Sequence, residues 1–275
     1  MAGTLYVVAT PLGNLGDLSP RAADTLKRVA VVAAEDTRHS KPLLQHAGSH
    51  AELISFHEHS SDRALDRILR ILTDGRDVAF ITDAGTPVIS DPGVALVAGA
   101  RERGIQVVTV PGPTAVAASL SVSGIGGDRY LFLGFLPRKG SDRRRFLLTA
   151  AQSEWTVVIF EAPNRVTQLL ADLAQVCGPE RQAAVSRELT KVFEETRAGT
   201  LQELSEHYAE APARGEVTVV LSGTGKQHVE EPPPDPGERA KALLAEGLSR
   251  KDVAHRLAEE TGISRNAAYR LVSEL

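Results

Sequence analysis

Short apolar runs alternate with amphipathic stretches through the first 123 residues of this 275-residue chain. The apolar runs predict strands at residues 4–10, 29–34, 52–56, 77–82 and 106–110. The stretches between and after them predict helices at residues 19–28, 37–45, 62–72, 94–103 and 114–120. Parallel strands need a crossover connection, and a crossover helix packs on the face of the sheet. The alternation therefore predicts a parallel sheet covered by helices on both faces.

A second α/β unit is expected after the glycine-rich segment at residues 124–127. Its predicted strands are residues 130–136, 155–160, 182–187, 195–199 and 216–221, and its predicted helices are residues 142–151, 164–176 and 201–208. The last strands follow one another closely, which favours some antiparallel pairing and a mixed sheet. We therefore expect a first α/β domain at residues 1–123 and a second at residues 124–223.

The end of the chain changes character. Residues 224–237 contain four prolines and are typical of an extended linker. Residues 238–275 then predict a helical tail, with helices at 238–246, 250–260 and 264–273. Ser249 and Ser264 stand where N-caps of the last two helices are expected. Two helices joined by a short glycine-containing turn indicate a helix-turn-helix.

The loop at residues 83–93 reads Asp-Ala-Gly-Thr-Pro-Val-Ile-Ser-Asp-Pro-Gly and follows a buried strand. Its small residues let backbone approach a ligand closely, and its only charges are acidic. This favours a small, partly cationic or zwitterionic ligand over a nucleotide triphosphate. In a parallel sheet the carboxyl ends of the strands lie along one edge. The loops at residues 11–17, 35–38, 57–59 and 111–115 are therefore expected to face the same cleft.

The sequence lacks the residues that several common kinds of functional site require. The single cysteine, Cys177, excludes an internal disulfide and a cysteine zinc cluster. Neither a dinucleotide fingerprint, a phosphate-binding P-loop nor a serine-hydrolase elbow is present. His57-x-His59 has no third ligand at a recognised spacing, so no metal is predicted. The net charge of −4 argues against wholesale coating of nucleic acid. No apolar run or leader of membrane type occurs, so we expect a cytoplasmic protein.

A set of motifs follows in order along nearly the whole chain: YVVATPLGNLGDL at 6–18, AEDTR at 34–38, FHEH at 56–59, the loop at 83–93, VPGPTA at 110–115, FLGFLPRK at 132–139 and FEAPNR at 160–165. Together they resemble the ribosomal small-subunit RNA cytidine 2′-O-ribose methyltransferases of the tetrapyrrole methylase superfamily. The resemblance implies two α/β domains of the tetrapyrrole methylase type, S-adenosylmethionine bound between them as methyl donor, and a homodimer. It also implies methyl transfer to a cytidine ribose in the decoding region of 16S ribosomal RNA.

The resemblance places the superfamily's first glycine-rich loop at residues 11–17 and its Gly-Asp-Pro motif at residues 82–84, where only the carboxylate of Asp83 is kept. The donor contacts that it implies are Pro11 or Leu12, Asp83, Thr86, Thr114, Ala115 and Ala162. Asp83 can accept hydrogen bonds from the donor's amine or ribose. Backbone groups of the small residues can approach the adenine and the methionine carboxylate.

Methyl transfer to a ribose hydroxyl is an in-line displacement at a carbon that the sulfonium already activates. The enzyme has to align the oxygen and guide away its proton. The candidate catalytic residues are Glu35 and Arg38 in one cluster, and Glu188 and Lys191 in another. A carboxylate could act as the base, and the cation could hold a flanking phosphate. An ordinary surface ion pair is the alternative at each position.

The segment RKGSDRRR at residues 138–145 has five basic residues against one acid. Cations at the start of a helix oppose its dipole, which favours a functional role for this cluster. The predicted RNA contacts are Arg138, Lys139, Arg143, Arg144, Arg145 and Arg165, with Arg265 and Arg270 in the tail. The expected partner is the small ribosomal subunit or its RNA, and the arginines at 143–145 are expected to serve RNA rather than stability.

Two other functions stay open at this point. A methyltransferase acting on a tetrapyrrole or another small molecule would need neither the arginine cluster nor the tail. A nucleic-acid-binding regulator acting through the tail would leave the cleft loops without a role.

Overall fold

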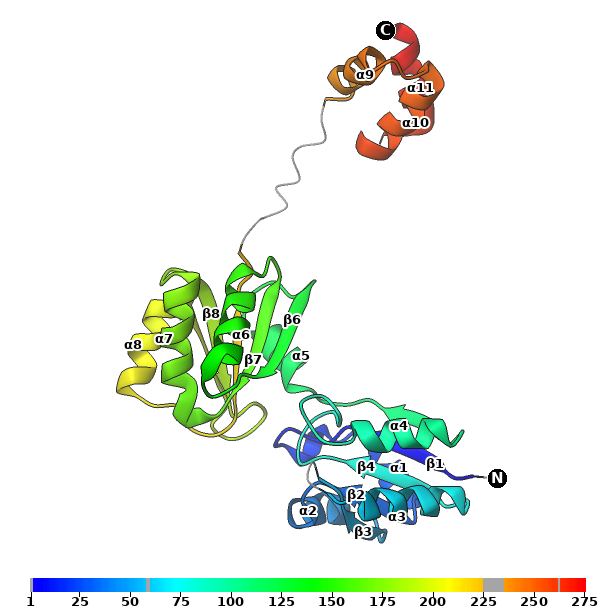
Figure 1. The fold of residues 1–275 in the computed structure, drawn as a ribbon, viewed down its shortest axis with the longest axis vertical. Helices are drawn as coiled ribbons and strands as arrows, with labels where there is room; N and C mark the ends of the chain where they lie inside the picture. Colours follow the sequence, from blue (N-terminus) through cyan, green and yellow to red (C-terminus); the bar gives the residue numbers. More distant parts are fainter. Residues whose placement is uncertain (1, 58–59, 225–234, 262) are drawn as a thin grey trace. The chain divides into compact units, whose positions relative to one another are not determined.

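The computed structural model describes residues 2–57, 60–224, 235–261 and 263–275, and the side chains of 259 and 260 lie outside this description. The chain divides into two compact units, Met1–Thr224 and Gly225–Leu275. Figure 1 shows the fold along the chain. Among the described residues, no helix is long and apolar enough to cross a membrane.

The first sheet contains the strands β1 (Thr4–Val8), β2 (Val31–Ala34), β3 (Glu52–Ser55), β4 (Val78–Ile81) and β5 (Gln106–Val110). They pair in the order β3-β2-β4-β1-β5, and every pairing is parallel, as the alternation predicted. The connecting helices are α1 (Pro20–Arg28), α2 (Thr37–Ala47), α3 (Asp62–Thr73), α4 (Val94–Glu102) and α5 (Ala115–Val122). Separate hydrophobic clusters fill the two faces of the sheet. The parallel, doubly covered sheet is therefore confirmed.

The strand order brings three loops together. β1 lies between β4 and β5, so the chain segments that leave these three strands begin side by side at one edge of the sheet. β1 ends at Val8 instead of the expected residue 10 because Thr10 leaves the sheet. The backbone of Thr10 pairs instead with Gly85, through hydrogen bonds of 2.8 and 3.1 Å. This topological switch point is where ligands bind in open α/β sheets.

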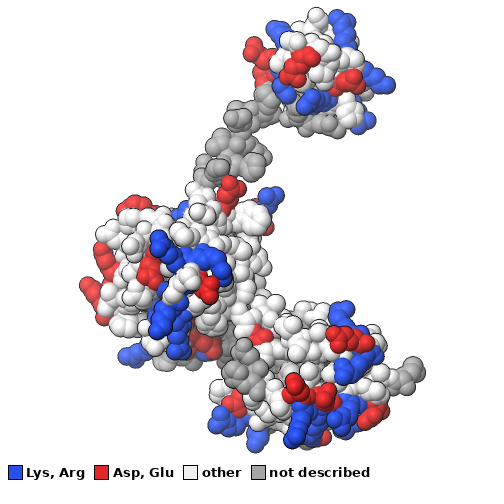
Figure 2. Space-filling model, in the orientation of Figure 1, with Lys and Arg blue, Asp and Glu red and all other residues white. Residues whose placement is uncertain are grey.

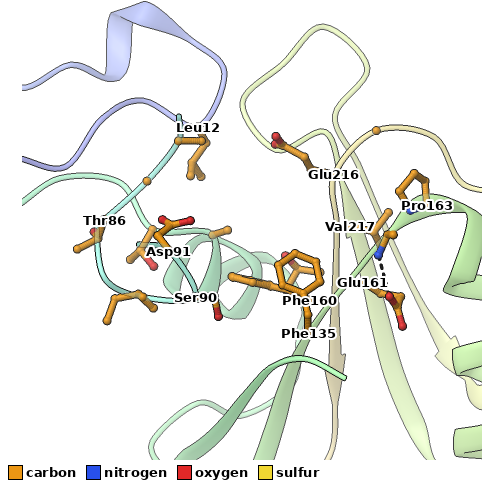
Figure 3. A pocket seen from close by; sticks show the side chains of 18 residues that line it. Leu12, Thr86, Ser90, Asp91, Phe135, Phe160, Glu161, Pro163, Glu216 and Val217 are labelled. Atoms are coloured by element: carbon orange, nitrogen blue, oxygen red, sulfur yellow. Dashed lines mark hydrogen bonds between the residues drawn. The ribbon is translucent and has the colours of Figure 1, made fainter. Parts of the chain in front are cut away.

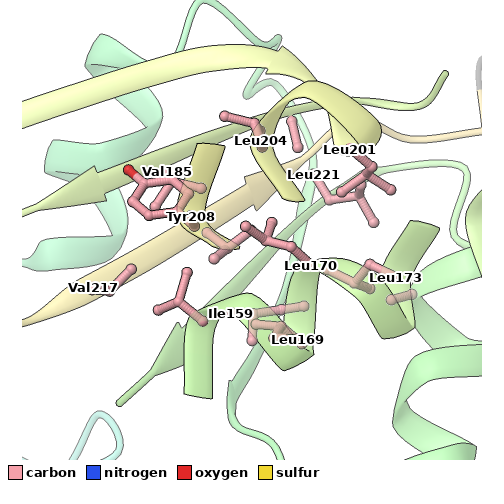
Figure 4. Close-up of a cluster of buried hydrophobic side chains, with 14 of the residues drawn as sticks. Ile159, Leu169, Leu170, Leu173, Val185, Leu201, Leu204, Tyr208, Val217 and Leu221 are labelled. Carbon is pink, nitrogen blue, oxygen red and sulfur yellow. The ribbon is translucent and has the colours of Figure 1, made fainter. Parts of the chain in front are cut away.

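The second sheet contains β6 (Tyr130–Phe135), β7 (Thr156–Glu161), β8 (Gln182–Arg187), β9 (Glu195–Thr200) and β10 (Val217–Leu221), in the order β6-β7-β10-β8-β9. β6 and β7 are parallel, whereas the other pairings are antiparallel, so the predicted mixed sheet is confirmed. Its helices are α6 (Gly140–Gln152), α7 (Val166–Cys177) and α8 (Leu201–Glu210). Leucines of α7 and α8 pack with the valines of the central strands to form its core (Figure 4).

Two short 3-10 turns, η1 (Leu15–Asp17) and η2 (Pro163–Arg165), shape the loops after β1 and β7. Helix α5 packs against β10 and so joins the two sheets within one unit. The separate domains predicted at residues 1–123 and 124–223 therefore have their own cores but share one compact unit, and that boundary stays a prediction.

The second unit is a bundle of α9 (Pro236–Ala245), α10 (Arg250–Thr261) and α11 (Arg265–Glu274) around its own apolar core. Ser249 accepts from the backbone N–H of Asp252, and Ser264 from that of Ala267, so the predicted serine caps are confirmed. The predicted linker at 224–237 ends too late, because Pro236 is already the first residue of α9, capped by Asp235. Most of the remaining linker lies outside the described residues.

Candidate active site

Three loops of the first sheet form one wall of a cavity. The hydroxyl of Thr86, after β4, donates to the carbonyl of Pro113, after β5, over 3.1 Å. A Cβ placed on Gly85 would lie 3.3 Å from the Leu12 side chain. With the pairing of Thr10 and Gly85, these contacts hold the ends of β1, β4 and β5 in one arrangement.

The cavity has a volume of about 290 Å³ and is closed on its other side by residues of the second sheet. Figure 3 shows Leu12, Thr86 and Asp91 on one side, facing Phe160 and Glu216 on the other. Its lining consists of Leu12, Ala84, Gly85, Thr86, Ile89, Ser90, Asp91, Thr114, Ala115, Phe135, Phe160, Glu161, Ala162, Pro163, Gly215, Glu216, Val217 and Thr218. We refer to it below as the first cavity.

Most of the predicted donor contacts come together here. Leu12, Thr86, Thr114, Ala115 and Ala162 all line the first cavity. Pro11 and Asp83 do not line it. The Asp83 carboxylate accepts the backbone N–H of Asp36 over 3.2 Å and lies 3.4 Å from the His39 ring nitrogen. Asp83 therefore connects the loops after β4 and β2. Whether any of the seven residues contacts a donor stays a prediction.

Two loops beside the first cavity have unusual backbone. Val88 and Ser90 adopt φ values of 77° and 62°, and Glu188 and Thr190 adopt 50° and 67°. Left-handed backbone is unfavourable for residues with a side chain, above all for β-branched ones, and it collects at functional positions. Both loops are therefore held by their surroundings in conformations that short peptides would avoid.

Asp91 is a candidate that the sequence reasoning missed. It lines the first cavity and also a second one, of about 670 Å³, whose wall includes Glu35, Phe56, His57 and Asp62. Partial burial and the nearby carboxylates of Glu35 and Asp83 raise the pKa of Asp91 to about 6, against the effect of the Thr82 hydroxyl. A carboxyl group whose pKa lies close to neutral pH is suited to proton transfer. The loop itself was recognised in the sequence, but its second acid gave no local signal.

The predicted catalytic residues fall in different surroundings. Glu35 lines the second cavity. Arg38 is 86% exposed and bonded to Asp36, two residues before it. Hydrogen bonds from Arg38 hold the pKa of Asp36 far below its usual range, so this pair stays charged. Arg38 lines neither cavity.

Glu188 and Lys191 belong to an ion cluster that includes Glu216, on the side of the first cavity formed by the second sheet. The Lys191 ammonium lies 2.9 Å from Glu188 and 3.1 Å from Glu216, and Glu216 lines the first cavity. The Lys191 stem runs against Gly13 of the loop after β1, where a Cβ would lie 2.3 Å from it. The bond from Lys191 lowers the pKa of Glu188, and burial of Lys191 is outweighed by its two carboxylates, which raise its pKa. Glu188 is thus a neutralised carboxylate and a weak base.

The basic segment 138–145 is not uniform. Arg138, Lys139, Arg144 and Arg145 are exposed, and Figure 2 shows basic side chains gathered over the part of the surface formed by α6. Arg143 is buried instead, and its guanidinium donates to Asp172 over 2.7 and 3.0 Å and to the carbonyl of Pro137 over 3.2 Å. Arg143 therefore stabilises the fold, which the sequence did not lead us to expect, and its contact with RNA stays a prediction.

The remaining predicted RNA contacts are split between the units. Arg165, at the end of η2, donates to the buried Glu161 and to the carbonyl of Leu136, over 3.0 and 2.7 Å. Its side chain is 24% exposed beside the first cavity. Arg265 and Arg270 are exposed on α11 of the second unit. Their contact with RNA stays a prediction.

Some lining residues carry no signal in the sequence. Phe135 and Phe160 come from β6 and β7, and their rings meet edge to face with centroids 5.6 Å apart. Phe135 is 58% exposed, whereas an apolar residue in a predicted strand is expected to be buried. Glu216 and Thr218 reach the cavity from β10 and the residue before it. These residues meet the first sheet only through tertiary packing, so no local pattern could identify them.

Comparison with known proteins places this arrangement in a family. The family model of the Tetrapyrrole (Corrin/Porphyrin) Methylases matches residues 4–205. The chain belongs to this family. The match covers the first sheet, the strands β6 to β9 of the second sheet, and the residues that line the first cavity up to Ala162 and Pro163, whereas β10 lies beyond it. It includes the predicted donor contacts.

Curated relatives give a narrower likeness. The chain is 45% identical over 269 residues to a Xylella fastidiosa protein named ribosomal RNA small subunit methyltransferase I, covering 97% of this chain and 98% of the relative. It is 46% identical over 270 residues to the Pseudomonas aeruginosa protein of the same name, covering 98% and 96%. The likeness extends through the helical second unit, which the family model does not reach.

Solved structures of the family share the fold. A Thermus thermophilus uroporphyrin-III C-methyltransferase, complexed with S-adenosyl homocysteine, is 20% identical with a TM-score of 0.60, covering 80% of this chain and 97% of that one. A cobalt precorrin-4 methyltransferase is 18% identical with a TM-score of 0.61, covering 80% and 94%. The predicted two-domain fold of the tetrapyrrole methylase type is thus confirmed.

Proposed function

We propose that the protein is an S-adenosylmethionine-dependent methyltransferase of small-subunit ribosomal RNA, and that its product is a cytidine methylated on the ribose 2′-oxygen in the decoding region of 16S RNA. The main support is the identity of about half of all residues, over nearly the full length, to proteins named ribosomal RNA small subunit methyltransferase I. The family relationship supports the donor, and the motifs of the chain support the ribose oxygen as acceptor.

The first cavity suits S-adenosylmethionine by its chemistry. Phe135 and Phe160 offer aromatic surface to an adenine or a sulfonium. The Glu216 carboxylate supplies negative charge on the same wall. Helix α5 begins at the cavity wall, at Thr114 and Ala115, and the backbone N–H groups of a helix N-terminus suit a carboxylate. When bound, the donor would supply an activated methyl group, and the protein would supply alignment and proton transfer.

The exposed cations on and before α6 support an RNA substrate. Arg138, Lys139, Arg144 and Arg145 are accessible on the same unit as the cavity. Phosphate contacts of this kind hold RNA in register without reading its sequence. Residues 235–275 add a separately folded unit with Arg265 and Arg270 exposed, which we propose as an accessory RNA-docking module. A homodimer, which the resemblance implies, and a cytoplasmic location, where ribosomal RNA would be met as substrate, complete the proposal.

A tetrapyrrole substrate is the second candidate, because the structural neighbours are named for such substrates. At 22% identity or less, that likeness supports only the fold. The tetrapyrrole hypothesis gives no role to the exposed α6 cations or to the helical unit. A regulator that acts through the tail alone would give no role to the first cavity.

Methyl transfer from labelled S-adenosylmethionine tests the proposal. Purified protein is incubated with small ribosomal subunits lacking the modification, with their free RNA, and with uroporphyrinogen III. Label in one cytidine of the RNA, resistant to alkaline hydrolysis at its 3′ side, is the expected result. Label in the tetrapyrrole alone, or in neither acceptor under conditions where S-adenosyl homocysteine binds, would contradict it.

A further inference from the structure

The second cavity adjoins the first. Both are lined by Ser90 and Asp91, so one short segment forms a wall common to the two. The second cavity is otherwise lined by Glu35 after β2, by Phe56, His57 and Ser60 after β3, and by residues at the start of α3 and of α4. With about 670 Å³ it lies within the range of roughly 300–1,000 Å³ found for small-ligand sites.

The shared wall is held firmly in place. Gly93 has a φ of 124°, and a Cβ on it would lie 2.2 Å from the Phe80 ring, so the backbone passes directly over a buried side chain. Ser90, with its φ of 62°, lies against Gly134, where a Cβ would be 2.9 Å from the serine oxygen. Gly134 stands at the irregularity in β6. Asp91 is therefore positioned from both sides by packed backbone.

The walls of the second cavity match a nucleoside better than a phosphate. Phe56, Leu65 and Pro92 provide apolar surface, and Glu35, His57, Ser60, Ser61 and Asp62 provide polar groups. No lysine or arginine is among the described residues that line it. Carboxylates accept hydrogen bonds from the exocyclic amine of cytosine, which is the group that distinguishes this base from uracil. The phosphates of a bound strand would lie outside this cavity.

We propose that the second cavity holds the target nucleoside, with the base splayed out of the RNA, and that Asp91 is the group that takes the proton from the ribose 2′-hydroxyl. This inference rests on the proposed function and adds its acceptor site and its base. The ribose oxygen forms a bond to the methyl carbon while the carbon–sulfur bond breaks and its electron pair stays on sulfur. The hydroxyl proton passes to the Asp91 carboxylate and from there to water.

The other carboxylates are less suited to this step. Glu188 is bonded to Lys191 and to the backbone N–H of Glu216. Asp83 is bonded to Asp36 and paired with His39. Asp91 instead faces the negative charges of Glu35 and Asp83, with His57 and Asp62 in the same cavity, so its protonated form is favoured. Glu35 is the candidate for accepting a hydrogen bond from the exocyclic amine of cytosine.

Asp91→Asn tests the base, because it keeps the shape of the side chain and removes the proton acceptor. In single-turnover methylation of small subunits we expect a loss of about 100-fold or more. The wild-type rate is expected to rise with pH through about 6, and the variant rate to be flat. S-adenosyl homocysteine affinity by calorimetry and subunit affinity should stay within about threefold, since a single neutral hydrogen bond contributes modestly. Asp24→Asn, on the exposed face of α1, is the matched control.

Two further variants separate the cavity from the base. Ser61→Trp, at an exposed position on the rim of the second cavity, should fill it and abolish methylation while S-adenosyl homocysteine still binds. Glu35→Gln removes a negative charge that raises the pKa of Asp91, so the acidic limb of the pH profile should move to lower pH. A shift to higher pH would contradict the assignment.

The outcomes distinguish the two levels of the proposal. If the wild-type protein does not methylate the subunit, the proposed function fails. If it does, and Asp91→Asn keeps the wild-type rate and pH profile, Asp91 is not the base. If Asp91→Asn loses S-adenosyl homocysteine binding in proportion to activity, Asp91 belongs to the donor site and the inference fails. If Ser61→Trp methylates normally, the nucleoside binds elsewhere.

Discussion

The loop after β4 (residues 82–93) and the loop after β8 (residues 188–194) look alike at the level of the backbone. Each has two non-glycine residues at positive φ, and each carries a carboxylate: Asp91 lines the first cavity, and Glu188 accepts the backbone N–H of Glu216, which lines it. Their charge environments are opposite. Lys191 neutralises Glu188, whereas Asp91 faces Glu35 and Asp83. Unusual backbone therefore marks both loops, but only the surrounding charges indicate which one can move a proton.

The largest expected effect on stability comes from Arg143, a buried arginine paired with a carboxylate, compared with its exposed neighbour Arg144. Arg143→Gln leaves Asp172 without its ion partner, so we expect a loss of about 3 kcal/mol in the free energy of unfolding. Arg144→Gln, one residue along and exposed, should change stability by less than about 0.5 kcal/mol. It should instead reduce the salt slope of RNA binding by about 1. Urea unfolding and salt titrations measure both, and equal stabilities would contradict the assignment of Arg143.

Lys191→Met should give the loop after β8 the same kind of charge environment as the loop after β4, in which Asp91 faces other carboxylates. Glu188 and Glu216 then lose the cation between them, and we expect a loss of about 2 kcal/mol in stability at pH 7. The bond from Lys191 lowers the pKa of Glu188 in the folded state, so its stabilisation is present above the unfolded pKa and is lost as pH falls through the folded value. The difference between wild type and variant should therefore shrink in acid. A constant difference from pH 4 to 7 would show that the loss comes from packing alone.

Asp91→Asn should have the smallest effect on stability and the opposite sign. The pKa of Asp91 is raised to about 6 on folding, so the ionised form opposes the folded state. Stability from this group is full below the unfolded pKa and is lost as pH rises through the folded value. After discounting for its partial exposure, removing the charge should stabilise the protein by about 1 kcal/mol at pH 7. The gain should vanish near pH 4. A variant that is less stable than wild type at pH 7 would show that the ionised Asp91 carboxylate does not oppose folding.

The sequence was sufficient for the fold because its signals are local. Each strand of the first sheet lies in a short, mainly apolar run, and the parallel topology follows from the helices between the runs. The same topology predicted that the loops after β1, β4 and β5 would face one cleft, and the resemblance named Leu12, Thr86 and Thr114 within them, which all line the first cavity. The linker boundary failed only because Pro236 begins a helix as readily as it ends a linker.

The rest of the site depends on packing between sheets. Phe160 and Glu216 reach the first cavity from β7 and from the residue before β10, and nothing in their neighbourhoods in the chain reports this. Arg143 is different, because its burial could have been predicted. It shares a helix face with the buried Leu147 and Ala150, at the spacing of successive turns. Charge drew attention to the segment, but helical periodicity separates its inward arginine from its outward ones.

Direct titration of the two carboxylates tests the central comparison. Carboxyl ¹³C NMR of protein labelled at aspartate and glutamate side chains follows each group, with Asp91→Asn and Glu188→Gln used to assign the signals. We predict a midpoint of about 6 for Asp91 and one below 4.5 for Glu188. An Asp91 midpoint at or below 3.8, or a Glu188 midpoint above that of Asp91, would contradict it.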